Sequence, residues 1–127
     1  MNLLSDLVMR IKVANTAKIL KINVINSKLC LNILKVMYKL GYIRGFIVID
    51  SKTITVLLKY INNKPVIKNI YVISTPGRRV YLKSKELKRQ IDKKDSGFYI
   101  ISTSKGLMTD EEVLLFNIGG EALIKIS

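Results

Sequence analysis

Several residue types are scarce in this chain of 127 residues, and each scarcity narrows what the protein can do. Histidine is missing, which removes the commonest general base and the commonest metal ligand. The single cysteine, Cys30, cannot form an internal disulfide, and we expect it to pack as a small hydrophobe in its apolar run. No cluster of cysteines or carboxylates has metal-site spacing. We therefore expect no metal and no cofactor.

Acidic residues are also scarce, with 9 Asp and Glu against 22 Lys and Arg and a net charge of +13. Such an excess favours a polyanionic partner, with nucleic acid first and an anionic membrane surface second. Lysine and asparagine break the apolar runs well short of the ~18 residues that a membrane span needs. The first residues resemble neither a signal peptide nor a transit peptide. We expect a protein that is made where it works or has already lost an import signal.

The first half of the chain alternates between helical and strand patterns. Apolar residues at helical spacing, and runs that alternate, predict five elements: helix 3–14, strand 19–24, helix 28–40, and strands 43–49 and 53–60. Ser27 is a good N-cap for the second helix, and Gly41 lies where a left-handed C-cap belongs. The order α-β-α-β-β predicts a small sheet with two helices on one face.

The polar stretch 61–65, which contains a proline, separates two hydrophobic blocks and predicts domains 1–62 and 63–127. The second domain should be mostly β with short helices, so the fold class is α+β. We predict strands 66–73, 80–82, 98–103 and 121–126, and helices 84–91 and 113–116, the latter capped at Thr109. In the turn after the first of these strands, Pro76 should preset φ and Gly77 should take a positive φ. Basic residues crowd 78–94, and we expect about half of them to meet phosphate.

The stretch Ser102–Asp110 is the most informative part of the chain. An apolar strand runs into three hydroxyl residues, then Lys105 and Gly106. Serine and threonine donate and accept, so they can pair with a ribose 2′-hydroxyl or a base edge, while Lys105 supplies a charge for phosphate. Gly106 can take φ > 0 and lets the backbone come close. The pattern is typical of RNA contact, and the alternative is a strand end whose hydroxyls face solvent.

The motifs in their order resemble one family over nearly the whole chain. The matching segments are Ser5–Ala14, Ser27–Leu29, Gly41–Ile43, Leu57–Tyr60, Ser74–Tyr81, Ser102–Asp110 and Gly119–Glu121. They resemble the S-eight family of small-subunit ribosomal proteins, of the bacterial and organellar type. The chain departs from the family in the helix after Asp110, where Glu111–Phe116 are acidic and bulky. This departure argues against a phosphate contact from that helix. It does not affect the contact expected from the stretch before it.

The resemblance implies two small, tightly packed α/β domains and a non-enzymatic, structural constituent of the small ribosomal subunit. It implies a primary rRNA-binding protein that binds the central domain of small-subunit rRNA, helps assemble the platform and touches neighbouring ribosomal proteins. The implied RNA-binding residues are Ser102, Thr103, Ser104, Lys105, Gly106 and Thr109, then Ser74, Pro76, Gly77, Arg78, Arg79 and Tyr81, then Glu121, and, in the first domain, Arg10, Lys12 and Lys28. The abundance of Ile, Lys and Asn favours a mitochondrial ribosome over a bacterial cytoplasm.

Other interpretations stay open at this point. Tyr81 would either stack on a base or pack in the core, and Glu121 would either hold the fold or accept from a base amine. Ser102-x-x-Lys105 matches an acyl-enzyme pattern, which requires both residues on one helix face. The chain could also be a generic basic nucleic-acid-binding protein. A peripheral membrane protein would need an amphipathic helix with many lysines, and helix 3–14 has only Arg10 and Lys12.

Overall fold

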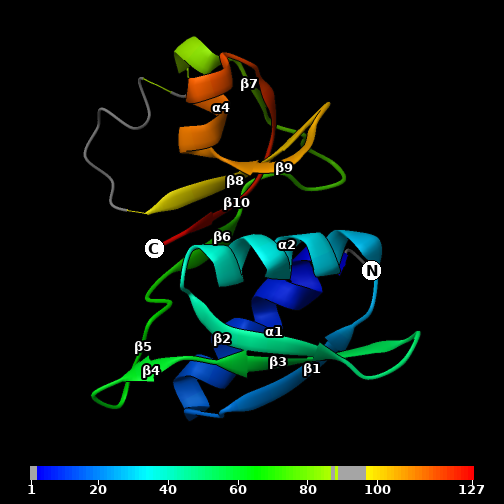
Figure 1. Cartoon of the computed structure of the whole chain (residues 1–127), viewed down its shortest axis with the longest axis vertical. Coiled ribbons are helices and arrows are strands. Elements are labelled where there is room, and N and C mark those ends of the chain that lie inside the picture. The colour runs from blue at the N-terminus through cyan, green and yellow to red at the C-terminus, as the bar shows by residue number, and fades with distance from the viewer. Residues whose placement is uncertain (1–2, 87, 89–96) are drawn as a thin grey trace. The chain divides into compact units, whose positions relative to one another are not determined.

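The computed structural model describes residues 3–86, 88 and 97–127 and has an α+β fold. The chain divides into two compact units, Met1–Lys68 and Asn69–Ser127 (Figure 1). The division falls between Lys68 and Asn69 rather than after Asn62. The polar stretch 61–65, predicted as the domain boundary, is part of a hairpin of β4 (Tyr60–Ile61) and β5 (Lys64–Pro65) within the first unit. Asn62 and Asn63 make its turn, with φ of 53° and 62°, a conformation that asparagine tolerates.

The first unit has the predicted α-β-α-β-β order. Its elements are α1 (Leu3–Ala17), β1 (Lys21–Ile25), α2 (Lys28–Lys39), β2 (Ile43–Val48) and β3 (Thr53–Leu58). The three strands form an antiparallel sheet in the order β1-β3-β2. Burial alternates along β3, where Ile54, Val56 and Leu58 are buried and the residues between them are partly exposed. One face of the sheet is therefore covered, and α1 and α2 supply buried side chains such as Ile11 and Leu34 to this core.

Local chemistry sets the ends of these elements. The Ser27 side chain accepts a hydrogen bond from the Cys30 N–H at 3.1 Å, and Gly41 has a φ of +83°, so both predicted caps of α2 are confirmed. Cys30 is buried, as expected. The Asp50 Oδ1 atom accepts from the N–H groups of Lys52 and Thr53, both at 2.8 Å, and so shapes the turn between β2 and β3.

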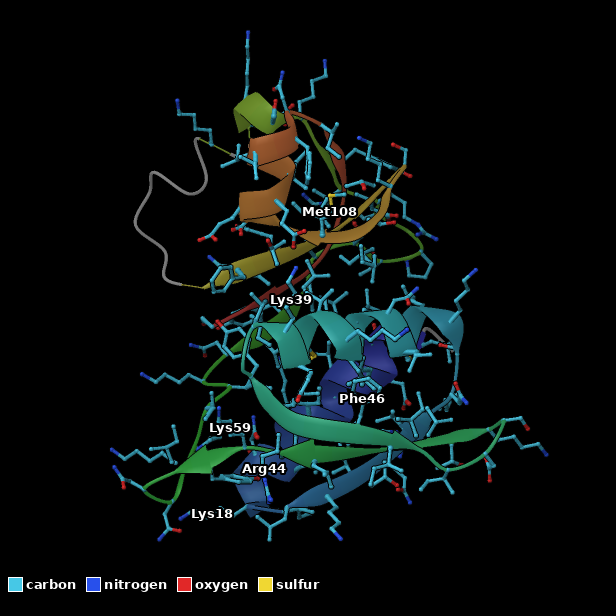
Figure 2. The ribbon with its side chains drawn as sticks, in the orientation of Figure 1. Lys18, Lys39, Arg44, Phe46, Lys59 and Met108 are labelled. Atoms are coloured by element: carbon cyan, nitrogen blue, oxygen red, sulfur yellow. The ribbon has the colours of Figure 1, made fainter. Side chains whose placement is uncertain are left out.

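The second unit is built around a central strand. Its elements are β6 (Ile70–Val72), β7 (Tyr81–Leu82), β8 (Phe98–Thr103), β9 (Gly106–Thr109), α4 (Asp110–Phe116) and β10 (Gly120–Ile126). The sheet order is β6-β10-β8-β9, and β7 also pairs with β10. Val113 of α4 packs on Ile101 and Met108, so α4 covers one face of the β8–β9 hairpin (Figures 1 and 2). β10 pairs with three strands that are far apart in the sequence.

Three details differ from the sequence predictions. The predicted strand 66–73 shortens to Ile70–Val72, because Val66 and Ile67 hydrogen-bond instead to Lys59 and Asn15 of the first unit. No strand was predicted between Thr103 and Thr109, but Gly106–Thr109 pairs with β8 as strand β9. Gly77 does not have a positive φ. Its turn is closed by two backbone hydrogen bonds between Thr75 and Arg78, each 3.0 Å long.

The remaining helices are short. Of the predicted helix 84–91, Ser84–Glu86 and Lys88 are helical, and the other residues lie outside the part that the structure describes. The last helix, α4, begins after the predicted cap Thr109. Among the described residues, no helix is both long and apolar enough to cross a membrane.

Candidate nucleic-acid interface

The turn of the β8–β9 hairpin presents Ser104 and Lys105 to solvent. The Thr103 hydroxyl donates to the Gly106 carbonyl at 2.8 Å and accepts from the Lys105 N–H at 3.1 Å. Gly106 has a φ of +103°, which a residue with a Cβ rarely adopts. Thr103 and Gly106 therefore shape the turn, and Ser104 and Lys105 are the side chains that it displays.

The ammonium of Lys105 lies over the ring of Phe116, with Nζ 5.5 Å from the ring centroid. Phe116 is the last residue of α4 and is itself exposed. A cation–π contact at an exposed site is worth about 0.5–1 kcal/mol, so it orients Lys105 without preventing it from reaching a phosphate. The sequence analysis missed this partner of Lys105, because Phe116 and Lys105 are brought together only by the packing of α4 beside the hairpin.

Three of the predicted site residues form one row across the sheet. In the strand register, Tyr81 of β7 is opposite Glu121 of β10, and Glu121 is opposite Ser102 of β8. Directly opposed residues in antiparallel strands project from the same face, so the phenol, carboxylate and hydroxyl are neighbours. Tyr81 is 68% exposed, which excludes the core interpretation and leaves its ring open to stacking.

Glu121 holds an arginine in this row. Its Oε2 atom accepts a hydrogen bond from Nη1 of Arg79 at 3.1 Å, and the two side chains form a salt bridge. The carboxylate is mostly buried, whereas the guanidinium is exposed. Glu121 thus fixes one edge of Arg79 and leaves other N–H groups directed outward. This geometry favours the interpretation in which Glu121 supports the site.

The turn before β7 is tied to β10 by a buried serine. Ser74 is 3% exposed, and its hydroxyl donates to the Ala122 carbonyl at 2.6 Å and accepts from the Val80 N–H at 3.0 Å. Pro76, Gly77 and Arg78 follow it in an exposed turn. Ser74 therefore positions this turn, while Arg78 is the side chain available at its surface.

Thr109 and Asp110 are buried where β9 meets α4. Thr109 is 4% exposed, and its hydroxyl accepts from the Glu112 N–H at 3.3 Å as the predicted N-cap. The Asp110 Oδ1 atom accepts from the Glu111 N–H at 2.8 Å. Burial raises the pKa of Asp110, and backbone hydrogen bonds from Tyr99 and Glu111 offset part of that rise. Both side chains are used in placing α4.

The RNA-binding residues predicted in the first unit are Arg10, Lys12 and Lys28. Arg10 donates through Nε to Asp6 Oδ2 at 2.9 Å and through Nη1 to the Asn23 carbonyl at 3.2 Å, which joins α1 to β1. Lys12 on α1 and Lys28 at the start of α2 are exposed. Figure 2 shows further basic side chains projecting from the same unit, among them Lys18, Lys39 and Arg44. The positive charge is thus spread over its surface.

The acyl-enzyme pattern lacks the geometry that it needs. Ser102 lies on β8 and Lys105 lies in the hairpin turn, so they do not share a helix face. In the described ranges, no group of three or more cysteine and carboxylate side chains is placed to hold a metal ion. The arrangement instead offers hydroxyls, an exposed phenol and cations at one end of a sheet, which suits a phosphate and sugar backbone.

Comparison with known proteins identifies the family. The family model described as ribosomal protein S8 matches residues 2–127. The small ribosomal subunit protein uS8m of Acanthamoeba castellanii is 63% identical over 127 residues, covering 100% of both chains. The uS8 proteins of Rhodospirillum centenum and Acholeplasma laidlawii are 40% and 45% identical, covering 97% and 94% of this chain and 95% and 92% of their own. The resemblance seen in the motifs is confirmed, and the chain belongs to the ribosomal protein S8 family.

Proposed function

We propose that this chain is a structural, non-catalytic protein of the small ribosomal subunit that binds the central domain of small-subunit rRNA. Its relatives are named as small ribosomal subunit proteins. The 63% identity with a mitochondrial uS8m favours a mitochondrial ribosome over a bacterial one. The net charge of +13 suits binding to a polyanion such as RNA.

One observation carries the RNA-binding proposal: three segments distant in the sequence meet at one end of the second unit's sheet. Strand pairing brings Tyr81, Glu121 and Ser102 into one row, and the exposed hairpin turn at Ser104 and Lys105 begins two residues after Ser102. A-form RNA displays 2′-hydroxyls and base edges in a wide minor groove, which hydroxyl side chains can reach. Tyr81 supplies a face for an unstacked base.

The residues of this surface have different roles, which their hydrogen bonds within the fold help to distinguish. Ser74, Thr103, Thr109 and Glu121 are engaged within the fold, so they position their neighbours. The side chains that we assign to RNA contact are Ser102, Ser104, Lys105, Arg78, Arg79 and Tyr81. Gly106, Pro76 and Gly77 shape the turns that display them. Lys12 and Lys28 are assigned to a second rRNA segment because both are exposed cations.

Binding to RNA tests the proposal directly. The purified chain is titrated with a central-domain fragment of small-subunit rRNA and, separately, with an unrelated RNA duplex of equal length, at several salt concentrations. Charge alone gives binding that collapses with salt and does not distinguish the two RNAs. We expect a preference for the fragment that persists at high salt. Equal, salt-labile binding to both would reduce the site to a basic surface and contradict the proposal.

A further inference from the structure

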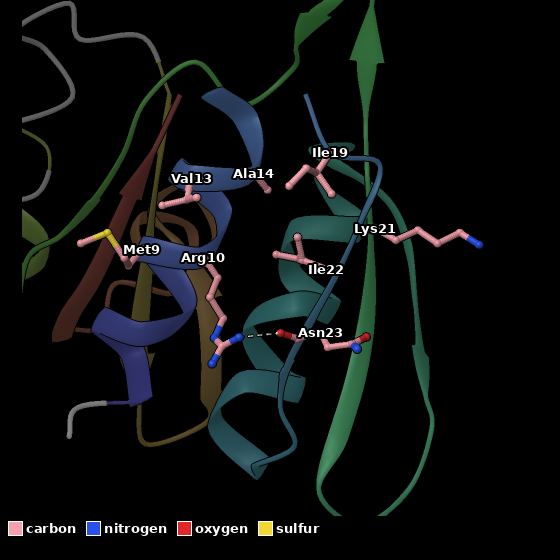
Figure 3. A pocket seen from close by; sticks show the side chains of 8 residues that line it. All are labelled: Met9, Arg10, Val13, Ala14, Ile19, Lys21, Ile22 and Asn23. Carbon is pink, nitrogen blue, oxygen red and sulfur yellow. Dashed lines mark hydrogen bonds between the residues drawn. The ribbon is translucent and has the colours of Figure 1, made fainter. Parts of the chain in front are cut away.

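A groove runs along helix α1 of the first unit and is not used by the proposed RNA surface. One hollow, of about 340 Å³, lies between α1 and β1 (Figure 3). Met9, Val13 and Ala14 line it from α1, and Ile19 and Ile22 line it from the chain that follows. We call this hollow the α1 groove.

Met9 and Val13, two of the apolar side chains that line the α1 groove, are not part of the core. The core stripe of α1 consists of Leu4, Leu7, Val8, Ile11 and Ala14. Met9 and Val13 lie one helical turn apart and do not belong to that stripe. Their side chains are 60% and 56% exposed. Covering such a surface gains about 25 cal/mol for each Å² removed from water. A helix that is apolar on two sides is typical of one that meets a second partner.

Arg10 closes one end of the α1 groove. It spans from α1 to β1, as Figure 3 shows, and its bonds to Asp6 and to the Asn23 carbonyl hold the guanidinium in place. Those two bonds occupy two of its five N–H groups. A held guanidinium is suited to a carboxylate, because both groups are planar and can form two parallel hydrogen bonds.

The charge of the α1 groove narrows the choice of occupant. Lys21 lines the groove together with Arg10, and among the described residues no acidic side chain lines it. Nucleic acid would satisfy the cations but would leave Met9 and Val13 against phosphate and water. A bilayer would meet a convex or flat face more readily than a hollow. A protein segment can offer apolar side chains and a carboxylate together.

We infer that the α1 groove is a docking site for a segment of another protein, which inserts apolar side chains against Met9 and Val13 and places an Asp or Glu carboxylate on Arg10. The volume of the hollow is at the small end for binding pockets, which suits a few side chains. The inference goes beyond rRNA binding and assigns Arg10 to protein recognition.

A photo-crosslinker in the groove identifies the occupant in intact cells. One variant of the full chain carries Val13→p-benzoylphenylalanine. The control carries the same residue at Ile47 of β2, which is 52% exposed and outside the groove. After irradiation, nuclease and protease digestion separate RNA adducts from protein adducts, and mass spectrometry gives the crosslinked segment. We expect a protein segment with an Asp or Glu within one helical turn of its apolar crosslinked residue, obtained from position 13 and not from position 47.

A synthetic peptide with the sequence of the crosslinked segment is then used to measure binding affinity for the groove. Val13→Glu places a negative charge in the groove and should weaken peptide binding about tenfold, whereas Ile47→Glu, with the same charge change, should stay within about twofold. A peptide whose acid is changed to its amide should also bind about tenfold more weakly. Affinity for the rRNA fragment should be equal in the two variants. Peptide binding therefore tests the docking site, and RNA binding tests the proposed function separately.

Four outcomes of the crosslinking experiment would overturn the inference. They are an adduct with RNA, an adduct with a second copy of this chain, a protein segment without an acid, and position 13 giving no adduct beyond that of position 47. Equal peptide affinity for Val13→Glu and Ile47→Glu would also overturn it. Circular dichroism of both variants checks that they are folded, which we expect because both positions are more than half exposed.

Discussion

The β8–β9 hairpin presents Ser104 and Lys105 to solvent, whereas α1 presents Met9 and Val13. Both regions stand on well-buried cores, with Ile101 under the hairpin and Ile11 under the helix. The hairpin displays hydroxyls and cations and has its turn set by Thr103 and Gly106. The helix displays apolar side chains and an arginine held by Asp6.

The difference shows that one basic chain can carry two kinds of surface. The net charge of +13 belongs to the chain as a whole and by itself suggests only a polyanionic partner. At the hairpin, charge is combined with groups that hydrogen-bond to ribose and bases. Along α1, charge is combined with apolar area, which RNA cannot cover favourably. Local chemistry therefore separates the proposed RNA surface from the proposed protein surface.

The largest effect is expected from Gly120→Ala, which disturbs the pairing of β10 with strand β8 of the hairpin. A Cβ at Gly120 would collide with the Ser102 carbonyl and lie 2.8 Å from Ile101 Cγ2, so β8 and β10 would have to separate. We expect the free energy of unfolding to fall by about 3 kcal/mol in urea titrations. Affinity for the rRNA fragment should fall with it, because Ser102 and Glu121 would lose their register.

Gly77→Ala is the matched control for this change. A Cβ at Gly77 meets no atom within 4 Å, and its φ is not positive. We expect its free energy of unfolding to stay within about 0.5 kcal/mol of the parent. Equal losses for the two variants would contradict the close approach of β8 and β10.

Ser74→Ala and Ser104→Ala sharpen the distinction between supporting and contacting hydroxyls. Ser74→Ala leaves the Ala122 carbonyl and the Val80 N–H without their buried partner and should cost about 2 kcal/mol of folding stability in urea titrations. Ser104→Ala should leave stability unchanged and weaken binding of the rRNA fragment by about 1–2 kcal/mol. Were Ser104→Ala to leave RNA affinity intact, Ser104 would have no contacting role.

Lys105→Ala tests the charge of the hairpin turn. Removing one phosphate contact should lower the slope of log affinity against log salt by about one and weaken binding about fivefold at low salt. The control is Lys35→Ala, the same change at an exposed position of α2. A loss that is equal at every salt concentration, or equal in the two variants, would contradict a phosphate contact by Lys105.

The smallest effect should be a pH dependence at Asp110. Burial raises the pKa of this carboxyl in the folded chain, so the unfolded chain releases its proton at lower pH. Between the two pKa values the folded state binds more protons, and its stability falls as pH rises. Asp110→Asn removes this penalty. The stability of the variant relative to the parent, from urea titrations, should therefore rise from pH 4 to neutral pH and then level off; a flat difference would contradict the shift.

Much of the local structure followed from short patterns. Ser27 and Gly41 marked the ends of α2, and Thr109 marked the start of α4, because capping depends on residues within one turn. Strand β9 was missed because its hydrophobic signal is brief and its pairing with β8 makes the strand. The hairpin at Asn62 and Asn63 was not predicted, because an Asn-Asn turn closes a hairpin as readily as it ends a domain.

The sequence by itself determined the fold class, the family and the stretch Ser102–Asp110 as the centre of the candidate site, because motifs and caps act over a few residues. Only the tertiary structure decided the direction of each side chain. Ser74 and Thr109 turned inward while Ser104 turned outward, although all three are small hydroxyl residues. Pairing across β10 brought Glu121 to Arg79, and packing of α1 beside β1 left the groove at Met9 and Val13. Such orientations depend on strand register and helix packing between distant segments, which no local pattern encodes.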